Sequence, residues 1–448
     1  MWRHGRDPLP KNATFSVKGT IMKWLSLLIL GLLLLPAQML SAAATTGAYD
    51  YPFVNPYEAT VIGTPTVYQA EVPKKVPVKD YQLVVFEDRE IPPVFWYSEG
   101  LNFSLVRQKE RAPLIFVIAG TGASYQSPKM KGLQRAFYQA GFSVISISSP
   151  THMNFIVNAS TTKVPGHIIH DSEDLYRVME LAYKKVAHRL DVSEFYLTGY
   201  SLGASQSAFL ARLDEERRVF NFKKVLMINP AVSLFNSVNI IDQMLDNTIG
   251  SEPGAFNSYL GRAIRGVATA FERDEPLDFN EDFLYRIYKK RIPSEAKLES
   301  LIGFSFRISS SNMIFTSDVM TQYGLIVPPG TELGQTTPLL EYFGAALHTS
   351  FVDYYDNYFY PFYKAQSPSL TSDQLQNQMS LRSITNYLRG ADKVALMTNN
   401  DDLILAPGEI DFLSEVFGDR ATIWPTGGHC GNMEQKDVVA FMVNFFKK

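Results

Sequence analysis

Short apolar runs and amphipathic segments alternate along the first half of the chain. The continuous apolar run 113–119 has the pattern of a strand buried on both faces of a sheet. The segment 171–190 has a helical period, and the next predicted strand, 194–198, follows it closely. This alternation predicts a mostly parallel sheet flanked by helices, an α/β fold. Further strands are predicted at 81–87, 102–107, 142–148 and 224–229, and further helices at 132–140 and 202–213.

The alternation stops in the middle of the chain and resumes toward its end. The intervening residues read as helices and loops without buried-strand runs, and strands return at 393–398 and 421–424. We therefore predict one α/β domain, formed by residues 81–230 and 389–448, that is interrupted by a large, mainly helical cap insertion over 231–388.

The N-terminal residues have a different pattern. Residues 1–44 are assigned to a signal-peptide region, in which Met22 and Lys23 precede an apolar run and a stretch of Ser and Ala. The run is shorter than the roughly 20 residues that span a bilayer as a helix. A cleaved signal peptide starting at Met22 predicts a periplasmic or secreted protein, and an uncleaved membrane anchor is the alternative. Residues 45–80, rich in Pro, Tyr and Thr, predict an extended N-terminal arm.

Composition narrows the class of protein. Hydrophobic residues make up 46% of the chain and charged residues 19%, which is typical of a globular protein with a sizeable core. The net charge of −3 comes without a block of Lys and Arg, so no nucleic-acid partner is expected. The single cysteine, Cys430, cannot form an internal disulfide. No His/Cys cluster predicts a metal site, and no cofactor is expected.

A candidate nucleophile lies in the G-x-S-x-G motif at 199–203. The motif follows a predicted strand and opens a predicted helix, which is the setting of a nucleophile elbow. Because such a turn is tight, the positions of Gly199 and Gly203 must lack side chains. Ser201 would then project above the sheet edge at the positive end of a helix. An ordinary serine in a glycine-rich turn is the alternative.

A serine hydroxyl is a poor nucleophile and needs a base. The chain has seven histidines, of which His429 follows the last predicted strand within Thr-Gly-Gly-His-Cys-Gly. The glycines on both sides are expected to let its ring reach over the sheet edge. His167 and His170, next to Asp171, are interpreted as capping or surface residues rather than metal ligands.

The remaining candidates would orient the base and stabilise the oxyanion. The loop after the first strand beyond the cap contains Asp401 and Asp402; we favour Asp402 as the residue that orients the imidazole, with Asp401 as its competitor. The predicted oxyanion donors are the backbone N–H groups of Leu202 and of Thr121, which lies in a glycine-rich loop. A phosphate-binding loop is the alternative there, but it lacks the G-K-[ST] ending.

The chain order Ser201, Asp402, His429, together with the serine turn, the glycine-rich loop and the terminal Gly-Gly-His, resembles the α/β-hydrolase superfamily. The resemblance covers the two parts of the predicted α/β domain and identifies no specific family. It implies a serine hydrolase of esterase or lipase type that cleaves a carboxylic ester of a lipid, lysophospholipid or polyester through an acyl-enzyme. Ala119 departs from the pattern, because many lipases and esterases have His before these glycines.

Other functions use the same residues. A serine peptidase or amidase and an acyltransferase are alternatives, and a non-catalytic binding protein of the cell envelope is an alternative of another class. The expected partner is a small-molecule or lipid ester, with the cap as the part that would meet a membrane surface. The aromatic segment 351–363 in the cap predicts either a lid over the site or the core of the cap itself.

Overall fold

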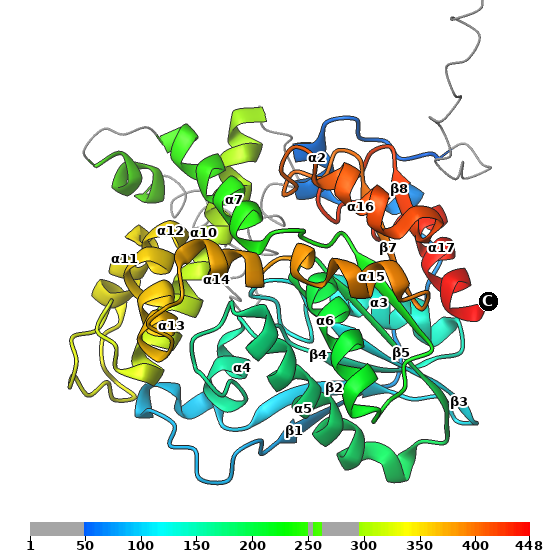
Figure 1. Cartoon of the computed structure of the whole chain (residues 1–448), viewed down its shortest axis with the longest axis horizontal. Coiled ribbons are helices and arrows are strands. Elements are labelled where there is room, and N and C mark those ends of the chain that lie inside the picture. Colours follow the sequence, from blue (N-terminus) through cyan, green and yellow to red (C-terminus); the bar gives the residue numbers. More distant parts are fainter. Residues whose placement is uncertain (1–48, 250–253, 262–294) are drawn as a thin grey trace, which may run out of the picture. The chain divides into compact units, whose positions relative to one another are not determined.

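A computed structural model describes residues 49–249, 254–261 and 295–448 (Figure 1). The predicted signal-peptide region, residues 1–44, lies outside these described residues. In the part of the chain that is described, no helix is long and apolar enough to cross a membrane.

The described residues form an eight-stranded sheet with the order β1-β2-β4-β3-β5-β6-β7-β8. β1 pairs antiparallel with β2, and β2 pairs antiparallel with β4. All the other neighbours are parallel, so the predicted mostly parallel sheet is confirmed. The strands are β1 (Val78–Leu83), β2 (Leu101–Val106), β3 (Ala112–Ile118), β4 (Ser143–Ile147), β5 (Val192–Tyr200), β6 (Lys224–Ile228), β7 (Val394–Asn399) and β8 (Ala421–Trp424).

Helices cover both faces of the sheet, as Figure 1 shows. Successive residues of β3 point to opposite faces, because side chains alternate along a strand. Leu114 and Phe116 pack in one core cluster with α5 (Ile168–Val186) and α6 (Leu202–Arg217). Ile115 and Val117 pack in a second cluster with α3 (Pro128–Gln139) and α17 (Lys436–Lys447). The predicted burial of 113–119 on both faces is therefore confirmed.

A helical insertion lies between β6 and β7 in the sequence. Its two long helices, α7 (Leu234–Ile249) and α10 (Glu295–Thr321), pack against each other. A buried ion pair joins them, with Arg307 Nη2 2.8 Å from Asp242 Oδ1. The other described elements of the insertion are α11 (Leu340–His348), α12 (Phe351–Tyr354), η4 (Tyr355–Phe359), α13 (Tyr360–Gln366), α14 (Ser372–Gln378), η5 (Leu381–Ile384) and α15 (Thr385–Gly390).

The N-terminal arm differs from the extended segment predicted for 45–80. It contains α2 (Pro56–Ile62) and a short 3-10 helix, η1 (Thr66–Tyr68), and β1 begins before the predicted end of the arm. Asn55 caps α2 by accepting hydrogen bonds from the N–H groups of Tyr57 and Glu58, and proline occupies the first helical position. Because α2 has only seven residues, it leaves no repeating apolar pattern in the sequence.

Candidate active site

Ser201 occupies the turn between β5 and α6, with φ 55° and ψ −123°. This region is rare for a residue with a side chain and marks a strained turn. A Cβ at Gly199 would lie 2.3 Å from the carbonyl oxygen of Gly203, and a Cβ at Gly203 would lie 2.4 Å from that of Ile118. The two glycines of the motif are therefore required by backbone contact, as the tight turn predicts.

The turn brings Ser201 to His429. The Oγ of Ser201 lies 2.9 Å from Nε2 of His429, and Nδ1 of the same ring lies 2.9 Å and 3.2 Å from the two carboxylate oxygens of Asp402. The Asp402 side chain is fully buried, and 16% of the His429 side chain is exposed. With the Nδ1–H donated to Asp402, Nε2 is placed to accept a hydrogen bond from the serine hydroxyl.

The two adjacent aspartates hold different groups. Asp401 accepts hydrogen bonds from the backbone N–H groups of Gly427 (3.2 Å) and Gly428 (2.9 Å), and so holds the loop in front of the histidine. Asp402 contacts the imidazole and also accepts a hydrogen bond of 2.8 Å from the side-chain amide of Asn229. The geometry thus favours Asp402 over Asp401 as the orienting residue.

Opposing effects set the pKa of His429. Burial, the largest single effect, disfavours the imidazolium, whereas interactions with Asp402 and Cys430 favour it. The interactions with these two residues together outweigh burial, and the pKa of His429 lies well above its ordinary value. An imidazolium formed during proton transfer would therefore be stabilised where it forms.

A small cavity of about 80 Å³ lies at Ser201 and His429. Both predicted oxyanion donors, Thr121 and Leu202, line it. Leu202 is the first residue of α6, where backbone N–H groups have no partner within the helix. Gly120 packs so closely on Tyr200 that a Cβ would lie 2.7 Å from the ring. The cap covers this cavity with side chains of α7 and α10, among them Leu234, Val238, Ile241, Ile302 and Phe306.

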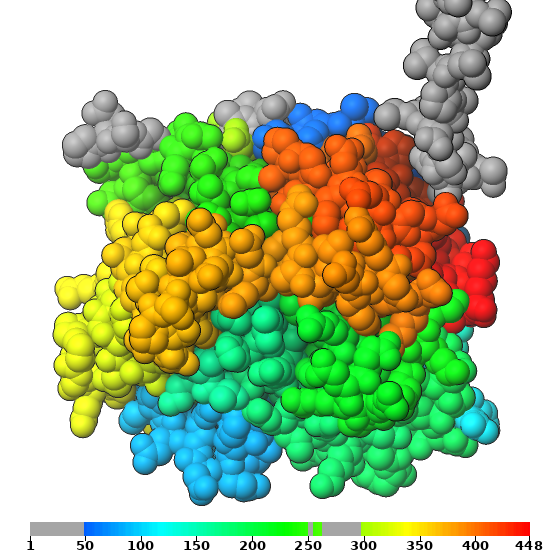
Figure 2. All heavy atoms as spheres, in the orientation of Figure 1, coloured from blue at the N-terminus to red at the C-terminus, as the bar shows by residue number. Residues whose placement is uncertain are grey.

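The structure places the aromatic segment 351–363 away from this cavity. Most of its rings are buried, those of Tyr354, Tyr355, Tyr358, Phe359 and Tyr363, and the hydroxyls of Tyr354 and Tyr363 donate to the carbonyl oxygens of Pro165 and Val164, both at 3.1 Å. Figure 2 shows the yellow and orange cap residues lying against the teal residues of the core. No residue of the segment lines the cavity at Ser201, so the packing favours the interpretation as the core of the cap over the interpretation as a lid.

The other conspicuous histidines lie apart from Ser201. The rings of His167 and His170, at the start of α5, have centroids 4.4 Å apart, and both contact Tyr363. Burial and, to a smaller extent, the neighbouring His170 lower the pKa of His167 to about 4. Within the described ranges, no group of three or more His, Cys, Asp or Glu residues could hold a metal ion.

The sequence analysis missed Thr60, which lies on α2. The backbone N–H of His429 donates to Thr60 Oγ1 at 2.9 Å. A Cβ at Gly428 would lie 2.3 Å from the carbonyl oxygen of Pro56, and a Cβ at Gly431 would lie 2.0 Å from that of Ala59. The glycines around His429 therefore allow the backbone of α2 to pack against this loop. The sequence-based prediction gave them a different role, which was to let the ring reach over the sheet edge. Glycines on both sides of His429 were the available signal, but they did not indicate which segment packs there.

Comparisons with known proteins reveal only distant likeness. No protein-family model matches the sequence, and no curated protein matches it. Among solved structures, the thioesterase domain from the curacin biosynthetic pathway is 10% identical, with a TM-score of 0.39 over 83% of this chain and 99% of that domain. An esterase from Pyrococcus furiosus is 12% identical, with a TM-score of 0.39 over 84% and 97%. Est1E from Butyrivibrio proteoclasticus is 13% identical, with a TM-score of 0.34 over 78% and 97%.

These similarities are too low to support an argument about chemistry. The assignment of the fold depends on the sheet of this chain, in which β2 is antiparallel to both of its neighbours, the other pairs are parallel, and the serine turn follows β5. Since the insertion also enters between two adjacent parallel strands, after β6, the chain has the α/β-hydrolase fold.

Proposed function

We propose that this protein is a serine hydrolase that cleaves carboxylic esters. The observation that carries the proposal is the hydrogen-bonded series from Ser201 through His429 to Asp402, with 2.9 Å between Ser201 Oγ and Nε2 and 2.9 Å between Nδ1 and the carboxylate. A neutral imidazole in this position can activate a hydroxyl, and a buried carboxylate stabilises the cation that results.

The reaction follows from these contacts. Ser201 Oγ attacks the ester carbonyl carbon while its proton moves to Nε2 of His429. The N–H groups of Leu202 and Thr121 donate to the oxyanion, and His429 then returns the proton to the departing alcohol. Water, activated by the same imidazole, attacks the acyl-enzyme, and the acid leaves with Ser201 restored. No step requires a metal or a cofactor.

Lipids, lysophospholipids and polyesters are the substrate classes that this machinery could serve. Amide cleavage and acyl transfer would use the same residues with a different leaving group or acceptor. A binding protein of the cell envelope that kept the fold without turnover is the alternative of another class. The pairing of Ser201 with His429 and Asp402 favours catalysis over this alternative.

Covalent labelling tests the proposal most directly. The purified protein would be treated with a fluorophosphonate probe, with Ser201→Ala as the control, and both would be assayed on p-nitrophenyl esters. We expect labelling and hydrolysis that disappear together in the variant. A folded wild-type protein that neither takes the label nor hydrolyses any ester would overturn the catalytic proposal and favour the binding protein.

We also propose that the protein is exported and that the segment before residue 45 is removed. The support is the apolar run followed by Ser and Ala in residues 22–44. N-terminal sequencing of the protein recovered from cell fractions tests this. A mature N-terminus near Ala44 or Thr45 in the periplasmic or secreted fraction is expected, and an intact N-terminus in the membrane fraction would instead support an uncleaved anchor.

A further inference from the structure

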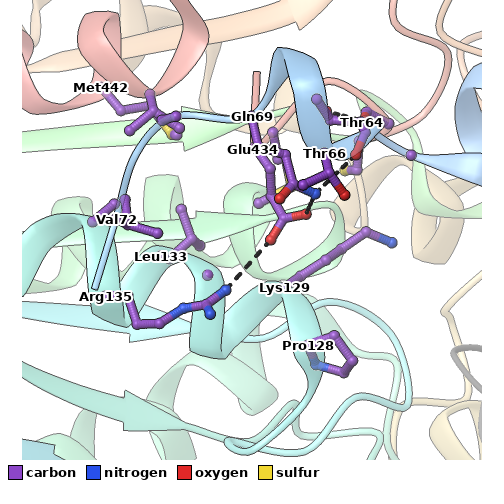
Figure 3. A pocket seen from close by; sticks show the side chains of 18 of the residues that line it. Thr64, Thr66, Gln69, Val72, Pro128, Lys129, Leu133, Arg135, Glu434 and Met442 are labelled. Carbon is purple, nitrogen blue, oxygen red and sulfur yellow. Dashed lines mark hydrogen bonds and ion pairs between the residues drawn. The ribbon is translucent and has the colours of Figure 1, made fainter. Parts of the chain in front are cut away.

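A second and larger cavity adjoins the cavity at Ser201. It measures about 560 Å³, compared with about 80 Å³ at the nucleophile. Cavities that hold small ligands are generally about 300–1,000 Å³, so only the larger one has the volume for most of a substrate. It lies between the N-terminal arm, α3 and the beginning of α17, and Figure 3 shows its lining residues.

The two cavities have a common wall. Thr60, Lys129 and Cys430 line both of them. Cys430 directly follows the proposed base, and its Sγ lies 3.8 Å from Nε2 of His429. Cys430 therefore lies between the larger cavity and the nitrogen that donates a proton to the leaving group.

Five charged side chains line the larger cavity: Glu71, Lys74, Lys129, Arg135 and Glu434. Glu71 and Lys74 are exposed and Lys129 is partly exposed, whereas Glu434 interacts with neighbouring side chains. Glu434 accepts a hydrogen bond from Gln69 Nε2 at 3.1 Å and lies 3.7 Å from Nη2 of Arg135, and Figure 3 shows these two interactions. Gln69 Nε2 also donates to the carbonyl oxygen of Thr64 at 2.9 Å. Much of the remaining lining is apolar and includes the buried side chains of Val61, Leu133, Met433 and Met442. The buried part of the lining therefore suits an apolar group.

We propose that the larger cavity binds the alcohol moiety of the substrate, and that the enzyme cleaves short-acid esters of bulky, apolar alcohols. This inference rests on the proposed ester hydrolysis. His429 Nε2 must protonate the oxygen of the departing alcohol, so the alcohol lies beside Nε2, near Cys430, which also lines the larger cavity. The acyl group remains on Ser201, in the small cavity that α7 and α10 cover, where only a short acid fits.

Two series of esters test the alcohol part and the acid part of the substrate separately. In the first, acetates of rising alcohol length are hydrolysed; in the second, methyl esters of rising acid length. Acid release is followed by titration, so that no chromogenic alcohol is needed. We expect kcat/KM to rise about tenfold or more along the acetate series, since each methylene in an apolar pocket contributes, and to fall along the acid series.

Bulky substitutions test whether the larger cavity causes this preference. Val439 and Val72 line it from α17 and from the arm, and both are only partly buried, so Val439→Trp and Val72→Trp would fill it. Gln139→Trp, on the exposed surface of α3, is the matched control. The two filling variants should lose the gain with long alcohols, measured as the ratio of kcat/KM for a long-alcohol acetate to that for methyl acetate, and the control should keep this ratio.

A further measurement distinguishes failure of this inference from failure of the proposed ester hydrolysis. Titration of Ser201 with a small fluorophosphonate reports the nucleophile without using the larger cavity. If the wild type is labelled but its preference follows acid length, or if both filling variants keep the full gain with long alcohols, the inference is wrong while ester hydrolysis stands. If the folded wild type is not labelled and hydrolyses neither series, both proposals fail.

Discussion

Two conspicuous segments of the sequence have opposite roles in the structure. The loop 426–431 contains His429 among glycines, and most residues of the segment 351–363 are aromatic. The loop follows β8 at the sheet edge, where its histidine meets Ser201. The aromatic segment is buried in the cap and contacts the residues that lead into α5. Position after a strand indicated chemistry, whereas unusual composition indicated packing.

The physical reason lies in what each residue type contributes. Buried Tyr and Phe rings stabilise a fold through the area that they remove from water, and each Tyr hydroxyl needs only one partner. In the cap, Tyr358 meets this need through Ser317, at 3.0 Å. A catalytic histidine needs a particular orientation instead, and the short turn after a strand supplies it.

Replacing the proposed base in the loop 426–431 should have the largest effect on activity. We expect His429→Ala to lower kcat by roughly 10⁴-fold or more, because Ser201 then has no group to accept its proton. Steady-state ester hydrolysis measures this, and unchanged circular dichroism would establish that the variant is folded. Retention of most of the activity would mean that another group is the base.

The aromatic segment should respond in stability rather than in catalysis. Tyr354 is fully buried, so Tyr354→Ala should lower the free energy of unfolding by about 3–5 kcal/mol. Denaturant titration measures the loss. Activity per folded molecule should stay close to that of the wild type, since the ring does not reach Ser201. A large loss of kcat with unchanged stability would restore the lid interpretation.

Thr60 lies outside both segments, but its side chain holds the loop that contains His429. Thr60→Val preserves the shape but removes the acceptor for the His429 N–H. We expect kcat to fall about tenfold to a hundredfold through misplacement of the imidazole, with KM little changed. Thr60→Ser should retain activity, and Val67→Thr, on the exposed surface of η1, should have no effect. Loss of kcat in the Val67 variant would indicate a general effect of the arm.

The pH profile should reveal a smaller effect of the same site. Only neutral His429 accepts the serine proton, so kcat/KM should fall as the pH drops through its pKa. Because that pKa is raised, the midpoint of the acid limb should lie above the ordinary histidine value of about 6.5. His167 should not contribute, since its pKa is lowered to about 4. A midpoint at or below 6.5 would mean that burial outweighs the charge of Asp402.

Much of the fold could be predicted from local pattern. Continuous apolar runs identified strands such as β3, and the loss of alternation identified the helical insertion, because both signals repeat over many residues. The helix α2 could not be predicted in this way. It is held by one cap residue, a proline and contacts with a loop that follows it by more than 360 residues. Such contacts leave no local period.

The candidate site likewise has some features that the sequence predicted and others that it did not. The sequence by itself determined that Ser201 would lie in a strained turn between glycines and that a histidine and an aspartate would follow later strands. The reason is that backbone sterics of the turn allow few residue types. Only the tertiary structure decided between Asp401 and Asp402, brought Thr60 to His429, and separated the aromatic segment from Ser201. These outcomes depend on distances of 2.9 to 3.2 Å between residues remote in the chain, which side-chain packing sets and no spacing encodes.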